Sequence, residues 1–158
     1  MASVSTAPYL FGDLLALARH SWVRQMASRL TERGYPEYRR TDAAVLRQLR
    51  GGPVPVGRLG AGLGVTRQAA RKVAEGLEQR GYARTERDVR DSRVLNVVLT
   101  AQGSAYARVM TEVIHDLNRD FCQQVDPAQL AAADSVLRAV LAGDSALQSA
   151  ASAISPPR

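Results

Sequence analysis

Residues 65–100 read VTRQAARKVAEGLEQRGYARTERDVRDSRVLNVVLT, and this stretch decides the fold. Its first half carries apolar residues at the spacing of one helix face, namely Ala69, Val73 and Leu77, with Ala70 beside them. Such a stripe predicts an amphipathic helix whose other faces are polar. Thr66 suits the N-cap of this helix, and Gly81 suits the position after its last turn. We therefore expect one helix between these two residues.

The pattern changes after Gly81, where the helical spacing stops. Tyr82–Arg87 and Val94–Thr100 have the pattern of two short β-strands, and the charged residues 88–93 between them predict a turn. A helix followed by a strand, a basic turn and a second strand is the layout of a winged helix-turn-helix. The sequence therefore predicts a mainly α fold with a small β-hairpin wing.

Motifs in and around the turn resemble those of a known family. The turn has the spacing D-x-R-D-x-R, formed by Asp88, Arg90, Asp91 and Arg93. The sequence L-T-x-x-G follows at residues 99–103, and residues 64–66 and 77–82 fit the frame of a recognition helix. On these motifs the chain resembles the MarR family of transcriptional regulators, over roughly residues 9–142.

The resemblance implies a winged helix-turn-helix flanked by long helices through which two copies dimerise. We expect a disordered N-terminus at 1–8, a single domain at 9–142 and a flexible tail at 143–158. Within the domain, the dimerisation helices are expected at 9–33 and 104–142, and the DNA-binding lobe at 41–103.

The long helices carry more apolar surface than one small lobe can cover. The first helix has two apolar stripes, one formed by Leu10, Leu14 and Leu17 and the other by Phe11, Leu15, Trp22, Met26 and Leu30. Asp126 and Pro127 are typical of a helix start. In the helix that follows we expect burial of Leu130, Ala133, Leu137, Val140 and Leu141. Such faces need further neighbours, so the sequence predicts a homodimer.

Residues 56–63 stand where the first helix of the helix-turn-helix is expected, yet they contain Gly57, Gly60 and Gly62. Each glycine costs up to about 1 kcal/mol relative to alanine in a helix interior. Two interpretations remain open. Small residues could let the recognition helix pack very close, or the glycines could reflect only a compositional bias of the genome.

The composition favours a polyanionic partner. The chain has 158 residues, a formal net charge of +6 and a pI near 10.2, and Lys72 is its only lysine. A domain pI above about 9 is typical of nucleic-acid binders, although excess arginine can also serve solubility alone. Arginine forks suit phosphates and guanine edges better than lysine does.

Other features indicate location and chemistry. With the single cysteine Cys122 the chain cannot form an internal disulfide, which fits a reducing cytoplasm. We find neither a secretory signal nor the roughly 20 apolar residues of a membrane span, so we expect a cytoplasmic protein.

The two histidines, His20 and His115, stand in no catalytic or metal-binding motif. We therefore expect no enzyme, no metal and no cofactor.

The exposed start of the recognition helix offers side chains suited to double-stranded DNA, namely Thr66, Arg67, Gln68, Arg71 and Lys72. In the major groove, glutamine suits adenine, and arginine or lysine suits guanine. Arg67 and Arg71 are one turn apart and are expected to share a face, with Gln68 beside them. The alternative is that some of these residues contact only phosphate, as half or more of protein–DNA hydrogen bonds do.

The wing offers three arginines, Arg87, Arg90 and Arg93. Arginines on a β-turn can reach the adjacent minor groove, and the resemblance implies that Arg90 enters it. Acidic groups would be repelled by phosphates. We therefore expect Asp88 and Asp91 to shape the wing by pairing with neighbouring arginines.

The resemblance also implies a small aromatic or phenolic effector, bound in a crevice between the dimer arm and the DNA-binding lobe. His20, Trp22 and Tyr38 are candidates for its lining, although each is equally readable as core or surface. The favoured function is a ligand-responsive repressor that binds a palindromic operator as a homodimer. The alternative is a non-regulatory winged helix that docks proteins or binds DNA architecturally.

Overall fold

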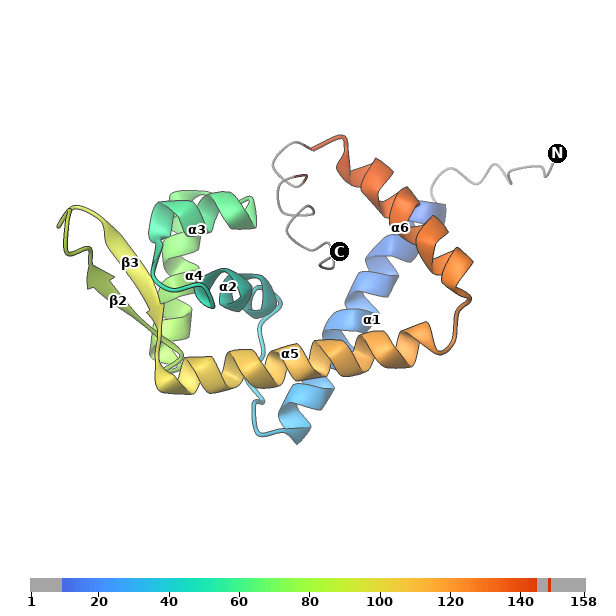
Figure 1. The fold of residues 1–158 in the computed structure, drawn as a ribbon, viewed down its shortest axis with the longest axis horizontal. Coiled ribbons are helices and arrows are strands. Elements are labelled where there is room, and N and C mark those ends of the chain that lie inside the picture. The colour runs from blue at the N-terminus through green and yellow to red at the C-terminus, as the bar shows by residue number, and fades with distance from the viewer. Residues whose placement is uncertain (1–9, 145–147, 149–158) are drawn as a thin grey trace. The chain divides into compact units, whose positions relative to one another are not determined.

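The computed structural model describes residues 10–144 and residue 148. The chain divides into two units, Met1–Arg40 and Thr41–Arg158. Among the described residues the first unit contains the helix α1 (Leu10–Glu32), and every other helix and strand belongs to the second unit (Figure 1). The expected disordered N-terminus, and the expected tail apart from residues 143, 144 and 148, lie outside the described residues.

The second unit is mainly α-helical and contains a small antiparallel sheet. Its elements in chain order are α2 (Asp42–Leu49), β1 (Val54–Pro55), α3 (Val56–Leu63), α4 (Arg67–Gln79), β2 (Ala83–Arg87), β3 (Leu95–Leu99), α5 (Ala101–Cys122) and α6 (Pro127–Leu141). The strand order is β1-β3-β2. The predicted class, mainly α with a β-hairpin wing, is confirmed.

The wing is built on a regular hairpin, with Thr85 of β2 opposite Val97 of β3. Val97 is fully buried and anchors the sheet to the core. The short strand β1 was not predicted. It pairs Val54 with Val97 at the sheet edge, where the missing N–H of Pro55 is tolerated.

Helix α4 begins and ends where the sequence indicates. The Thr66 hydroxyl accepts a hydrogen bond from the Ala69 amide at 3.2 Å, and Gly81 has a φ of 75°, a conformation that favours glycine. The buried face of α4 is displaced by one position from the predicted apolar stripe. The fully buried residues are Ala70, Ala74, Gly76 and Leu77, whereas Ala69 and Val73 are half-buried.

Close packing of α3 on α4 accounts for one of the three glycines in α3. A Cβ at Gly60 would lie 3.1 Å from the Val65 carbonyl oxygen and 3.3 Å from the Ala70 Cβ. A Cβ at Gly62 would meet only the flexible Gln48 side chain, and one at Gly57 would meet nothing within 4 Å. The close-packing interpretation therefore applies to Gly60 alone.

Helix α5 buries one continuous apolar face. Its buried side chains include Tyr106, Met110, Val113 and Leu117, whereas Phe121, which continues the same helical spacing, is 48% exposed. Cys122 is exposed as well. In α6 the Asp126 cap and Pro127 stand as predicted, with a complete capping box.

The expected burial of the α6 stripe is not found within one chain. No α6 residue is fully buried, and Val136, Leu137 and Val140 are between 41% and 51% exposed. The first half of α1 is similar, with exposed apolar side chains at Leu10, Phe11, Leu14, Leu15 and Leu17.

None of the helices in the described part of the chain is both long and apolar enough to cross a membrane.

Candidate nucleic-acid interface

The start of α4 is the most basic exposed segment of a helix in the second unit. All five predicted residues are exposed there, namely Thr66, Arg67, Gln68, Arg71 and Lys72. The first turn contains no acidic residue, so the positive end of the helix dipole is reinforced and not offset. This end of α4 therefore attracts anions.

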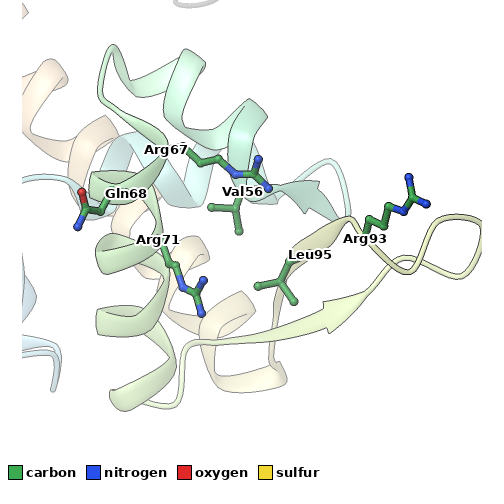
Figure 2. A pocket seen from close by; sticks show the side chains of 6 residues that line it. All are labelled: Val56, Arg67, Gln68, Arg71, Arg93 and Leu95. Atoms are coloured by element: carbon green, nitrogen blue, oxygen red, sulfur yellow. The ribbon is translucent and has the colours of Figure 1, made fainter.

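A groove lies between α4 and the wing (Figure 2). Its volume is about 510 Å³, and its lining consists of Val56, Arg67, Gln68, Arg71, Arg93 and Leu95. Figure 2 shows Arg67 and Arg71 on the side of α4 toward the wing, with Gln68 pointing from the other side of the helix. Arg67 and Arg71 thus share a face as predicted, and Gln68 faces differently. The sequence pattern did not reveal the apolar floor formed by Val56 and Leu95.

An unpredicted acidic residue restrains Arg71. The Arg71 Nε lies 3.1 Å from a carboxylate oxygen of Glu75, one turn further along α4. Both side chains are largely exposed, so this ion pair adds little to stability. Its effect is to hold the guanidinium along the helix surface until another acceptor is available.

The two wing aspartates bind backbone N–H groups. Asp88 Oδ1 accepts hydrogen bonds from the amides of Arg90 at 2.8 Å and Asp91 at 3.2 Å, and its Oδ2 accepts one from the Asn96 side chain at 2.9 Å. These bonds, the one from Arg90 above all, hold the pKa of Asp88 below its ordinary value. Asp91 likewise accepts from the Arg93 amide at 2.9 Å. This arrangement stands in place of the expected ion pairs with arginine side chains.

The three wing arginines are not equivalent. Arg87 donates from Nη1 to the Ser92 carbonyl oxygen at 2.8 Å and so helps to close the turn. Within the described part of the chain, the side chains of Arg90 and Arg93 make no hydrogen bond or ion pair. Both are exposed, as is Val89 at the tip, so the wing presents two guanidinium groups to solvent.

A buried polar cluster lies at the other end of α4 and was not predicted. The Arg80 guanidinium donates to both carboxylate oxygens of Asp42, at 2.7 and 2.9 Å, and the Tyr106 hydroxyl donates to the same carboxylate at 2.9 Å. Tyr82 stacks on Tyr106 with ring centroids 4.4 Å apart. The hydrogen bond to Asp42 raises the pKa of Arg80, and burial raises the pKa of Tyr106.

A smaller pocket of about 280 Å³ lies between α2 and α5. Its lining combines apolar side chains such as Leu46 and Met110 with the basic groups of Arg47, Arg50 and His115. Arg50 donates to the Thr111 hydroxyl at 3.0 Å across this pocket. The lining residues all belong to the second unit.

The predicted effector residues His20, Trp22 and Tyr38 belong to the first unit. The His20 side chain is exposed, and Trp22 and Tyr38 are half-buried.

Comparisons with known proteins give one family match, over part of the chain, and a set of similar solved structures. Residues 38–94 match the sequence profile of the MarR family. No curated protein matches the chain. Among solved structures, the PcaV transcriptional regulator from Streptomyces coelicolor, in complex with its natural ligand, is similar with a TM-score of 0.73 and 23% identity, over 92% of this chain and 99% of that one.

Two further structures have the same fold at low sequence identity. A mutant MarR from E. coli complexed with operator DNA gives a TM-score of 0.72 at 20% identity, over 85% of this chain and 94% of that one. BpsR of Bordetella bronchiseptica, whose DNA binding is regulated by 6-hydroxynicotinic acid, gives 0.68 at 20% identity, over 89% and 96% of the two chains. Residues 38–94 thus match the MarR family, and the chain has the winged helix-turn-helix fold of these transcriptional regulators.

Proposed function

We propose that the protein binds double-stranded DNA sequence-specifically, with α4 in the major groove and the wing at the adjacent minor groove. The observation that carries this proposal is the groove that Arg67 and Arg71 of α4 line together with Arg93 of the wing. A helix fits the major groove, where base edges present a full donor and acceptor code. The wing is suited to a neighbouring minor groove, where arginine is attracted to narrow A·T-rich stretches.

Each predicted residue has a role in this proposal. Arg67, Gln68 and Arg71 read base edges, and Thr66 and Lys72 bind the flanking phosphates. Arg90 and Arg93, whose guanidinium groups are exposed, contact the minor groove and its phosphates, and Arg87 supports the turn through its bond to Ser92. Asp88 and Asp91 hold the wing in shape through backbone N–H groups.

The proposed regulator acts as a homodimer. The exposed apolar side chains of α6 and of the first half of α1 form surfaces that a second copy can cover. A two-fold dimer presents two copies of α4, which matches an inverted repeat in the operator. Bound across a promoter, such a dimer excludes the transcription machinery, so repression in the cytoplasm is the proposed outcome.

We further propose that a small anionic aromatic compound controls DNA binding. The pocket between α2 and α5 has apolar walls for a ring and two arginines with a histidine for an acidic group. The similar PcaV and BpsR are described with a natural ligand and with 6-hydroxynicotinic acid. His20, Trp22 and Tyr38 of the first unit remain separate candidates for contact with an effector.

The alternative is a non-regulatory winged helix that docks proteins or binds DNA architecturally. A docking surface does not require basic side chains at both α4 and the wing, so the distribution of arginines favours DNA. An architectural binder would show little preference among DNA sequences.

Selection of bound fragments from genomic DNA tests the proposed function. We expect the recovered fragments to share an inverted repeat and to lie upstream of genes, the protein's own gene among them. A set of fragments without a common motif would contradict sequence-specific regulation and favour the architectural alternative.

A further inference from the structure

The buried cluster at the end of α4 joins three helices that are far apart in the sequence. Asp42 opens α2, Arg80 caps the C-terminal end of α4, and Tyr106 lies in the second turn of α5. Asp42 is fully buried, and the side chains of Arg80 and Asp42 are only 6% and 1% exposed. Arg80 also donates from Nε to the Gly76 carbonyl oxygen at 2.9 Å, which ties its guanidinium to its own helix.

Stability alone does not explain a buried ion pair of this kind. Removing two charges from water is costly, and replacing such a pair by apolar residues is often neutral or even stabilising. What a bidentate guanidinium–carboxylate pair adds is direction, because both N–H groups must align with both oxygens. Since Arg80 is held to α4 and Asp42 to α2, this alignment restricts the angle at which α4 leaves the cluster.

A second set of contacts fixes the same end of α4 to the start of α5. The Thr100 hydroxyl donates to the Gly81 carbonyl oxygen at 2.6 Å, and the Thr100 amide donates to the Tyr82 carbonyl oxygen at 3.2 Å. A Cβ at Gly103 would overlap with that Tyr82 oxygen, so glycine is needed for this approach. The C-terminal end of α4 is therefore fixed on both sides.

The DNA-facing residues lie at the opposite end of the same helix. From Arg80 to Arg67 the helix rises by about 20 Å, so a tilt of about 5° at the cluster displaces Arg67 by about 1.7 Å. Hydrogen-bond distances span only about 0.5 Å, so a displacement of this size breaks a contact with a base edge. Contacts with phosphates tolerate it better, because Coulomb attraction falls slowly with distance.

We infer that Arg80 is a positioning residue for DNA recognition, and that its fork on Asp42, supported by Tyr106, sets the angle at which α4 enters the major groove. The inference rests on the proposed function. It assigns to these residues control of sequence discrimination, and not of overall affinity for DNA.

The test measures the ratio of operator affinity to non-specific affinity at fixed salt, for variants shown to be folded by circular dichroism. Arg80→Lys keeps the charge but cannot form the fork, and should lower this ratio by about 5- to 150-fold, the effect of losing one base contact. Its affinity for non-specific DNA should stay unchanged, because the basic residues of α4 and the wing are intact.

An apolar replacement separates positioning from stability. The variant Asp42→Leu/Arg80→Met/Tyr106→Phe should fold about as stably as the wild type, because an intact apolar cluster replaces the ion pair. We expect it to bind non-specific DNA normally and to lose discrimination. Val113→Ala is the matched control, since it opens a cavity at a buried site two turns further along α5 and should keep the full ratio.

The outcomes distinguish the inference from the proposed function. The inference is overturned if Arg80→Lys keeps the wild-type ratio of operator to non-specific affinity, or if Val113→Ala lowers this ratio as much as Arg80→Lys does. The proposed function stands in both cases. If the triple variant does not fold, the affinity ratio measured for Arg80→Lys decides the test. A ratio near one in the wild type overturns the proposed function and the inference together.

Discussion

Arg71 and Arg90 carry the same charge but differ in what restrains them. Arg71 lies along α4 against Glu75, on the face that lines the groove. Arg90 projects from a turn whose backbone is held by Asp88. In the proposed function, Arg71 therefore reads a particular base edge, and Arg90 follows the shape and charge of the minor groove.

Substitution of the two arginines should therefore have different effects. Arg71→Ala should cost roughly 1–3 kcal/mol on the operator and relax the preference at one base pair. Arg90→Ala should weaken binding to many sequences and reduce the salt dependence by about one phosphate contact, without changing the preferred bases. Both variants are measured on a panel of single-base operator variants at several salt concentrations. Loss of base preference in Arg90→Ala alone would reverse the assigned roles.

At the scale of elements, the contact between α5 and the segment after α4 depends on a single glycine. A Cβ at Gly103 would overlap with the Tyr82 carbonyl oxygen, a backbone atom that cannot move without shifting the strand. Gly57 in α3 offers a matched comparison, because a Cβ there would meet nothing within 4 Å.

The two glycine substitutions should differ in their effect on stability. Gly103→Ala should lower the free energy of unfolding by about 1–3 kcal/mol or more, as overpacking does. Gly57→Ala should leave it unchanged or raise it by up to about 1 kcal/mol, because alanine is the better helix former. Urea unfolding of both variants measures the difference. Equal stability of Gly103→Ala and wild type would contradict the close approach.

The buried hydroxyl of Tyr106 should make stability fall in alkaline solution. Burial raises its pKa in the folded state, whereas the unfolded chain releases this proton near the ordinary value of 10.0. The contribution of the protonated Tyr106 hydroxyl to the free energy of unfolding is therefore complete below pH 10. It is lost as the pH rises above 10, by about 1.4 kcal/mol per pH unit. Unfolding of wild type and Tyr106→Phe between pH 8 and about 11.5 tests this. The stability advantage of the wild type should shrink above pH 10, and a constant difference would contradict the assignment.

Sequence-based prediction succeeded for elements whose signals are local. The Thr66 cap, the glycine at 81 and the strands on either side of the charged turn are each determined by a few neighbouring residues. The burial of α4 was displaced by one position because alanines at 69, 70 and 74 give little contrast between its faces. Strand β1 was missed because two residues, one of them proline, carry no strand pattern.

The buried cluster could not be predicted for a different reason. An aspartate in the first turn of a helix is usually an exposed complement to the helix dipole, and Asp42 has that position. Its partners Arg80 and Tyr106 are 38 and 64 residues away, so only the tertiary structure brings them together. The wing aspartates were expected to bind arginines, and the local backbone N–H groups proved to be their partners.

At the scale of the whole molecule, the exposed apolar side chains of α6 are the surface that a second copy would cover in the proposed dimer. Leu137 is 41% exposed, and Ser135 lies on the opposite side of the same helix. Leu137→Asp should shift the protein toward monomers at micromolar concentration and weaken operator binding, whereas Ser135→Asp should leave both unchanged. Analytical ultracentrifugation measures the oligomeric state. A wild type that is monomeric at this concentration would contradict the proposed dimer.

The measurement that tests sequence-specific DNA binding most directly is the affinity of the wild type for a selected operator and for a scrambled sequence of the same length and composition. Both are measured at several salt concentrations, because affinity for DNA has no meaning without the salt. We predict that at physiological salt the protein binds the operator about 10³-fold more tightly than the scrambled sequence, or better. We also predict that the operator is an inverted repeat whose half-sites lie about 34–36 Å apart. Equal affinity for the two sequences at every salt concentration would contradict the account.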